Sequence, residues 1–316
     1  MLETKKKLSA RDYVCIASML FGMFFGAGNL IFPVQLGQNA GSNVWVATLG
    51  FLITGVGLPL LGVASLGMSR SNGLLDMSSK VGKPFGKFFT IALYLTIGPF
   101  FAIPRCAATS FTIGFEQALP LGDLAWLFLL LFSAAFFIAV LAFSLFPGKI
   151  LTWIGKILNP TFLVFLGVLV IVAIVSPSAH VSDVAPVGDY ATRPFIQGFL
   201  DGYNTMDALA SLAFGIVVVQ VIRDLGVKEP ASVAKSTAFS GIFSCLFMAF
   251  IYFAVTIVGT QSRGFTGIAE NGGIALALIA KHYLGTTGLV ILAATVTFCC
   301  LKTAVALVTS CAETFN

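Results

Sequence analysis

The sequence predicts an all-α integral membrane protein, and three observations support this prediction. The chain has 316 residues, of which 58% are hydrophobic and only 10% are charged, whereas soluble domains hold about 25% charged residues. Apolar runs recur along nearly the whole chain, and a helix of roughly 20 apolar residues spans the core of a bilayer. The runs are continuous, whereas a membrane barrel would alternate apolar and polar residues.

Eight apolar runs are long enough to cross a membrane once each. They lie at residues 12–38, 43–68, 85–115, 124–146, 150–176, 195–221, 236–259 and 287–312. The longest connections are 177–194 and 260–286, and the second contains NGGIALALIAKHYLG, which we expect to form a short helix at the membrane surface. Since no soluble domain is visible, we predict a single polytopic membrane domain over residues 1–316.

Basic residues are unevenly distributed between the two ends of these spans. With the N-terminus in the cytoplasm, thirteen of the eighteen fall on the cytoplasmic side: Lys5, Lys6, Lys7, Arg11, Arg70, Lys80, Lys83, Lys87, Lys149, Lys156, Arg223, Lys228 and Lys235. Only Arg193, Arg263 and Lys281 fall on the opposite side. Cytoplasmic loops are enriched in Lys and Arg, so the pattern predicts a cytoplasmic N-terminus.

The first span contains GMFFGAGNLIFPVQLGQ at residues 22–38, a stretch that favours a break in the helix. Glycine leaves helical geometry easily, Asn29 can bond exposed backbone groups, and Pro33 lacks a backbone donor. Alternatively, the small residues form a close-packing face against another helix. Residues 26–29 are consecutive and cannot all lie on one face, which favours the unwound segment. A broken helix persists in a membrane only beside protein or a polar cavity.

The sixth span contains a second polar stretch, GYNTMDALASLAFG, at residues 202–215. Carboxylates inside a span are costly and indicate function. Asp201 has the alternative of lying at the outer membrane surface, whereas Asp207 lies one turn deeper. Breaks in the first and sixth spans, which run in opposite directions, predict an inverted repeat with a site at the bilayer midplane.

A site of this kind suits a zwitterionic amino acid. Half-helix N-termini carry partial positive charge that attracts a carboxylate, and free carbonyls at half-helix C-termini attract an ammonium group or a small cation. Phenylalanines near both breaks, such as Phe24, Phe25 and Phe214, would favour an apolar side chain. That last clue is weak, because any membrane interior offers similar residues.

Four motifs in chain order resemble one family of transporters. They are FGAGNLIFP, GPFFAIPRCAATSF, GYNTMDALASLAFG and CLKTAVALVTSCAE, in the first, third, sixth and eighth spans. Together they resemble the branched-chain amino acid:cation symporters, whose superfamily has a core of five helices repeated in inverted orientation. The resemblance covers essentially the whole chain. It implies cation-coupled uptake of leucine, isoleucine and valine across a bacterial plasma membrane by alternating access.

The resemblance also implies a set of site residues. Substrate contacts are implied at Gly26, Ala27, Gly28, Asn29, Tyr203, Asn204, Thr205 and Asp207. To these we add Phe100, as one of the aromatic residues around the site that would favour an apolar side chain. Sodium-coupled relatives imply a cation position between the carbonyls of Gly22 and Phe25 and the hydroxyl of Thr303, where Na+ would bind.

Two basic residues lie inside spans, and each has two interpretations. The ammonium group of Lys302 could replace the metal at the cation position and release a proton, so that H+ rather than Na+ is the coupling ion. Alternatively, Lys302 reaches a water-filled vestibule or snorkels toward the cytoplasm. Arg105 either forms a structural pair with a carboxylate of the bundle or takes part in a gate. The coupling ion therefore stays open between Na+ and H+.

The chain departs from the family pattern at its end. Residues 1–176 would form the first five-helix repeat, whereas 195–316 would form a second repeat that lacks its C-terminal helices. We therefore keep a second hypothesis, in which the chain is a truncated, non-transporting remnant or fragment of such a symporter.

An enzyme is not expected from this sequence. His180 and His282 lie far apart in outer connections, and we find neither metal-ligand spacing nor a phosphate-binding glycine loop. The six cysteines lie in or beside apolar runs and are expected to be buried thiols. We expect no cofactor besides the coupling ion and no nucleic-acid partner. The expected partners are branched-chain amino acids, the coupling cation and the lipid bilayer.

Overall fold

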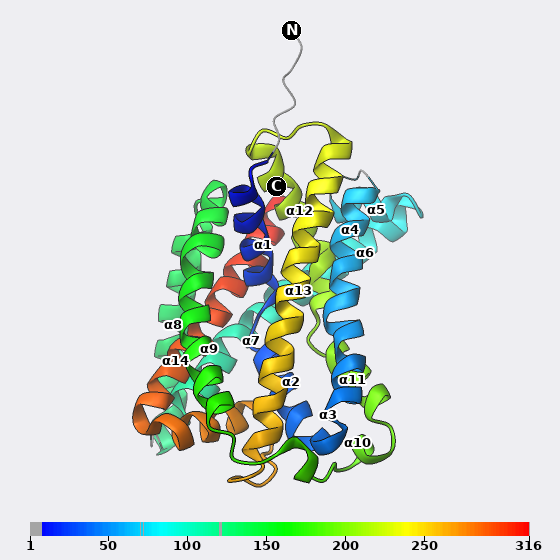
Figure 1. The fold of residues 1–316 in the computed structure, drawn as a ribbon. Coiled ribbons are helices and arrows are strands. Elements are labelled where there is room, and N and C mark those ends of the chain that lie inside the picture. The colour runs from blue at the N-terminus through cyan, green and yellow to red at the C-terminus, as the bar shows by residue number, and fades with distance from the viewer. Residues whose placement is uncertain (1–7, 70, 72, 120–121, 316) are drawn as a thin grey trace.

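The described part of the chain is a bundle of helices without strands (Figure 1). The computed structural model describes residues 8–69, 71, 73–119 and 122–315. In this part, seven continuous helical runs are long and apolar enough to cross a membrane, whereas the sequence predicted eight spans. The difference lies in the first span, which is divided between two helices. α1 (Ala10–Phe24) has only 15 residues, and α2 (Gly28–Ala40) continues into the next run, Gly28–Met68.

The run Gly28–Met68 reverses its direction at Gly41. The backbone of Gly41 has a φ of 51°, in the left-handed region that glycine adopts without strain. The chain then passes through α3 (Val44–Leu52) and α4 (Leu58–Met68), back to the end of the bundle where α1 began (Figure 1). α1 with α2, and α3 with α4, therefore follow two antiparallel paths.

The remaining helices are α5 (Leu74–Ser79), α6 (Lys83–Leu95), α7 (Ala102–Ser110), α8 (Ala125–Ser144), α9 (Asn159–Val175), α10 (Asp189–Thr192), α11 (Pro194–Tyr203), α12 (Asp207–Asp224), α13 (Pro230–Ser262) and α14 (Gly272–Phe315). Most of them follow the predicted spans, whereas the short helices α5 and α10 lie in the connections between them. The third span, between α6 and α7, bends because Gly98 has non-helical angles and Phe101 has a φ of −140°. The side chains after Gly98 therefore point in other directions than they would on one continuous straight helix.

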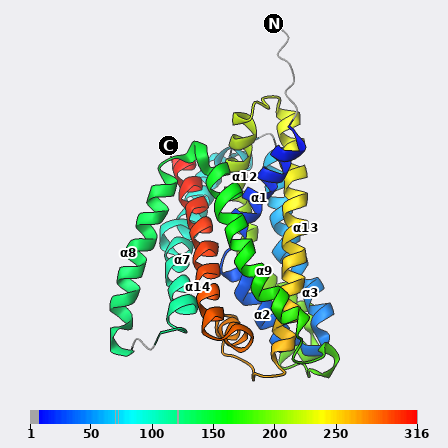
Figure 2. The same ribbon diagram turned by 60° about the vertical axis from the view of Figure 1, so that its left-hand side comes forward.

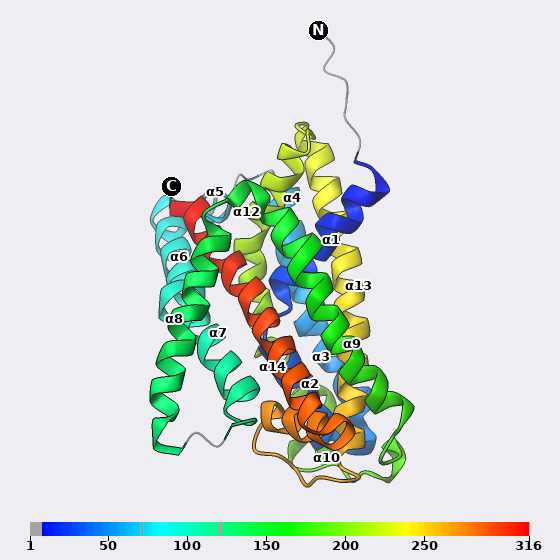
Figure 3. The same ribbon diagram turned by 90° about the vertical axis from the view of Figure 1, so that its left-hand side faces the viewer.

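The predicted short helix before the last span is present as the first part of α14. Gly285, with a φ of 59°, separates it from the long second part, and it lies across the lower end of the bundle (Figures 2 and 3). It is not simply a surface helix, because Ala275, Ile279 and Ala280 are at most 3% exposed. Its inner face packs beside Leu30 of α2 and near α9.

Charged residues are sorted by the two ends of the bundle. α1, α6 and α13 begin at the upper end in Figure 1, where α4 and α12 finish and where the chain turns from α8 to α9. The described basic residues that were predicted to be cytoplasmic lie on these ends and in this turn. Arg193, Arg263 and Lys281 belong to the opposite end. Lys5, Lys6, Lys7 and Arg70 lie outside the described residues.

Close helix packing through glycine occurs between α2 and α13 rather than at residues 26–28. A Cβ added at Gly37 would collide with the backbone of Thr256, and one at Gly259 would collide with the backbone of Val34. The hydroxyl of Thr260 donates a hydrogen bond of 2.8 Å to the carbonyl of Gly37. Small residues allow such close approach of membrane helices.

We predict that Gly259→Ala lowers the stability of the protein by about 1–3 kcal/mol, because the methyl group forces α2 and α13 apart. Gly167→Ala on α9 is the matched control, since a Cβ there meets nothing within 4 Å. Thermal unfolding in detergent micelles measures both. Equal melting temperatures for the two variants would contradict the packing described here.

Candidate functional site

The first helix is interrupted where the sequence predicted it. α1 ends at Phe24, and the ψ of 86° at Phe25 takes the chain out of the helix before α2 begins at Gly28. The Asn29 side chain accepts a hydrogen bond of 2.8 Å from the backbone N–H of Gly26. Asn29 therefore bonds the exposed backbone of the break, as expected from its type and position.

A second interruption lies between α11 and α12. α11 ends at Tyr203 and α12 begins at Asp207. Between them, Met206 has a φ of 64°, and no other described residue except glycine has a positive φ. Such left-handed backbone is uncommon for a residue with a side chain and persists only where the surroundings hold it. The two broken paths run in opposite directions through the bundle (Figure 1).

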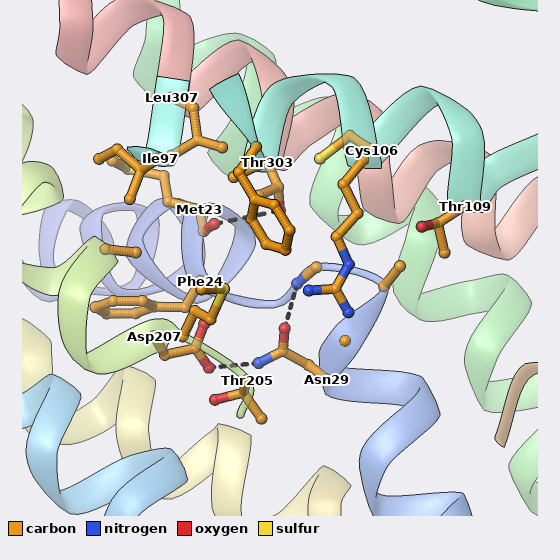
Figure 4. Close-up of a pocket in the computed structure, with 18 of the residues that line it drawn as sticks. Met23, Phe24, Asn29, Ile97, Cys106, Thr109, Thr205, Asp207, Thr303 and Leu307 are labelled. Carbon is orange, nitrogen blue, oxygen red and sulfur yellow. Dashed lines mark hydrogen bonds between the residues drawn. The ribbon is translucent and has the colours of Figure 1, made fainter. Parts of the chain in front are cut away.

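A buried network of polar side chains joins the two breaks. The amide Nδ2 of Asn29 donates to Oδ2 of Asp207 over 2.5 Å and also to the hydroxyl of Tyr252. The Tyr252 hydroxyl donates to the same Asp207 oxygen over 3.2 Å. All three residues are at most 3% exposed, and Figure 4 shows the Asn29–Asp207 bond beside the pocket. Asp207 is thus an interior carboxylate, whereas Asp201 is half-buried and accepts from the Tyr190 hydroxyl.

The breaks face a small cavity of about 80 Å³. Predicted substrate residues that line it are Gly26, Ala27, Gly28, Asn29, Thr205 and Asp207. Its other walls include Ile97, Cys106, Thr303 and Leu307 (Figure 4). Tyr203 and Asn204 instead line an adjoining hollow, together with Phe32 and Phe101.

Phe100 was predicted as a substrate contact, and this prediction is wrong. Its side chain is 75% exposed and lines neither the cavity nor the hollow. The non-helical backbone at Gly98 changes the register of the helix, so the next residue, Phe101, faces both spaces instead.

Lys302 does not snorkel, because it is completely buried. Its Nζ donates to the carbonyls of Phe25 over 2.8 Å and Gly22 over 3.2 Å, the two carbonyls of the predicted cation position. The Phe162 ring lies beneath the ammonium group, with its centroid 4.2 Å from Nζ. Thr303, predicted for the same position, donates to the Met23 carbonyl over 3.2 Å. The ammonium group of Lys302 thus lies at the C-terminal end of α1, at the predicted cation position.

Arg105 lines both the cavity and the hollow, from α7. Its guanidinium lies 5.5 Å from the centre of the Phe101 ring. Within the part of the chain that the structure describes, no carboxylate forms an ion pair with Arg105. The expectation of a structural pair with a carboxylate of the bundle is therefore wrong for the described residues.

Some residues of the site carried little sequence signal. Tyr252 and Phe162 are single aromatic residues within apolar runs, where many aromatic residues only fill space. Cys299 donates to the Phe25 carbonyl over 3.1 Å, although it was expected only as a buried thiol. Of the six cysteines, Cys15 and Cys311 are partly buried, and the other four are buried.

Residues 9–316 match the family described as Branched-chain amino acid transport protein. The chain belongs to this family. It is 53% identical over 311 residues to the branched-chain amino acid permease BrnQ of Lactobacillus delbrueckii subsp. lactis, and 42% identical over 311 residues to BrnQ of Bacillus subtilis. Each alignment covers 98% of this chain and 70% of the relative.

A carrier protein of Pseudomonas aeruginosa, branched-chain amino acid transport system 2, is 38% identical over 309 residues. That alignment covers 98% of this chain and 69% of the carrier. The branched-chain amino acid transport protein family is thus a family of membrane transporters and not of enzymes.

We predict that Asn29→Ala destabilises the protein by about 1–3 kcal/mol, because it removes one donor to the buried Asp207 carboxylate and the side-chain acceptor of the Gly26 N–H. Asn204→Ala is the matched control, since Asn204 is exposed at the other break. Thermal unfolding of the two variants in the same detergent measures the difference. An Asn29→Ala variant as stable as Asn204→Ala would show that the network does not hold the breaks together.

Proposed function

We propose that the protein is a secondary active transporter that takes up leucine, isoleucine and valine by cation-coupled symport with alternating access. The observation that carries this proposal is the meeting of two broken helices at one cavity, in a chain of this transporter family. Broken helices that expose backbone groups to an interior cavity are typical of substrate sites in secondary transporters. The bacterial plasma membrane and a cytoplasmic N-terminus are part of the proposal, supported by the basic residues at the upper end of the bundle.

The cavity offers suitable partners to each part of such a substrate. The N-terminus of α2 at Gly28 favours the carboxylate, and the Asp207 carboxylate favours the ammonium group. Phe24, Phe214 and Leu307 line the same cavity and would contact an apolar side chain. Gly26, Ala27, Asn29 and Thr205 would complete the substrate shell, with Tyr203 and Asn204 in the adjoining hollow.

For the coupling ion we propose H+, carried by Lys302. A sodium ion at the Gly22 and Phe25 carbonyls would have to displace an ammonium group that already bonds both. When Nζ gives its proton to water, the positive charge that holds these carbonyls is lost. The carbonyl end of α1 is then less firmly held against α14, so proton release and movement of α1 are linked.

The proposed moving body consists of the first, second, sixth and seventh spans, which rock against the third, fourth and eighth. Glycine contacts without room for a Cβ join the members of this body to one another, as between Gly50 and Phe195, Gly198 and Ala47, and Gly259 and Val34. Such contacts favour movement as one unit. We also propose that residues 1–176 and 195–316 form the two inverted repeats of the fold.

Uptake of radiolabelled leucine into proteoliposomes tests the function directly. We expect accumulation with an imposed H+ gradient and none with Na+ alone or without a gradient. Accumulation driven by Na+ would refute the role of Lys302 and retain the symporter. If folded protein accumulates no leucine under any gradient, the alternative of a non-transporting member of the family is favoured.

We predict that Gly28→Leu abolishes leucine binding and leaves the protein folded. A Cβ at Gly28 would have ordinary contacts, with the Phe32 ring at 3.5 Å and the Thr205 Cα at 4.0 Å, so a small side chain fits, but a leucine side chain would extend into the cavity. Gly28→Ala is the matched control and should bind leucine. The measurement is equilibrium binding in detergent. Leucine binding by the Gly28→Leu variant would show that the substrate lies elsewhere.

We predict that Lys302→Met loses H+-driven accumulation, so that internal leucine rises only to the external concentration. Exchange of internal for external leucine should continue, because Lys302 does not line the cavity and the Cys299 thiol still donates to the Phe25 carbonyl at the break. Lys87→Met, at an exposed position of α6, is the control and should accumulate leucine normally. Both activities are measured in the same vesicles. Undiminished accumulation by Lys302→Met would assign the proton to another group.

A further inference from the structure

The cavity is lined by one basic and one acidic side chain that come from different elements. Arg105 projects from α7, and Asp207 begins α12. Asp207 is 3% exposed, and its oxygens accept from Asn29 and Tyr252, which are neutral donors. Within the described residues, Arg105 and Asp207 form no ion pair with each other or with a third residue. Both side chains therefore reach the cavity without an ion-pair partner among the described residues.

Ionisable side chains in a membrane interior are unfavourable and indicate a function. A ligand with a single charge would neutralise one side of the cavity and leave the other uncompensated. A ligand with one carboxylate and one ammonium group would compensate both at once. Lys302 does not line the cavity, and its ammonium group donates to the carbonyls of Gly22 and Phe25.

We propose that Arg105 is the residue that binds the substrate carboxylate, while Asp207 binds the α-ammonium group. This inference rests on the proposed function and adds the charge recognition that selects the substrate. Arg105 is suited to the role because a guanidinium group can donate two parallel hydrogen bonds to one carboxylate. The nearby Phe101 ring, 5.5 Å away, can hold the guanidinium by a cation–π contact when no ligand is bound.

The position of Arg105 also links two spaces. It lines both the cavity and the adjoining hollow, where Phe32, Tyr203 and Asn204 form other walls. A carboxylate in the hollow can therefore meet the same guanidinium that later holds it in the cavity. The consequence is selection by charge: branched-chain amines lack the group that Arg105 binds, and branched-chain carboxylic acids without an amino group lack the group that Asp207 binds.

Equilibrium binding of three ligands of similar shape tests this inference. Leucine carries both charges, leucinamide carries only the ammonium group, and 4-methylpentanoate carries only the carboxylate. For Arg105→Gln we expect leucine affinity to fall about 10-fold to 100-fold, the range for loss of a charge-assisted bond. Leucinamide affinity should change less than about twofold, because this ligand has no carboxylate for Arg105 to bind.

Two further variants keep the test decisive. Arg105→Lys retains the charge without the two-pronged geometry, and we expect an intermediate loss for leucine only. Arg193→Gln removes an arginine that lines neither space and should leave all affinities unchanged. Gel filtration and thermal unfolding of each variant show whether it is folded. If Arg105→Gln does not fold, Arg105→Lys alone decides the question by the same comparison of leucine with leucinamide.

Unchanged leucine binding, or equal losses for leucine and leucinamide, would overturn the role of Arg105. The same binding measurements are repeated with alanine, phenylalanine and their amides. They test the preference for branched-chain substrates separately from the role of Arg105. Binding of another amino acid with the same dependence on Arg105 would support the charge recognition and refute the branched-chain preference. Absence of binding by every amino acid would refute both.

Discussion

The carbonyl groups that end α1 inside the bundle are the constraint on which the rest of the site depends. Unpaired backbone groups at membrane depth cost several kcal/mol each, so the first break exists only because donors reach it. Lys302 and Cys299 of α14 donate to the Phe25 carbonyl, and Lys302 also donates to Gly22. The break in the first helix and the lysine in the last one are therefore a single structural unit.

The other side of the break depends on a second partner. Asn29 bonds the freed N–H of Gly26 and, through its amide, the carboxylate that begins α12. A change in the backbone at one break therefore alters the hydrogen bonds at the other break. Tyr252 places α13 in the same network, and α13 packs against α2 through Gly259. Polar contacts at the site and close glycine contacts below it thus join the same helices.

Local composition was enough to predict both breaks, because glycine, asparagine and consecutive small residues favour non-helical backbone at their own positions. The resemblance to sodium-coupled relatives pointed to the carbonyls of Gly22 and Phe25 as a cation position, with Lys302 beside it. Placing Lys302 there rather than in a snorkelling position required the packing of α9 around it. Phe100 was misplaced because one non-helical glycine changes every later side-chain direction. Tyr252 was missed because a single tyrosine in an apolar helix has no pattern that identifies its neighbours.

The tethered ammonium group of Lys302 has an electrical consequence. In the proposed cycle, a carrier loaded with a zwitterion and a protonated lysine moves with one more positive charge than the empty carrier with a neutral lysine. One elementary charge therefore enters the cell per amino acid, and the membrane voltage contributes about 2.3 kcal/mol per 100 mV to accumulation. Because the charge resides on a side chain and not on a dissolved ion, the carrier itself is the voltage-sensitive element.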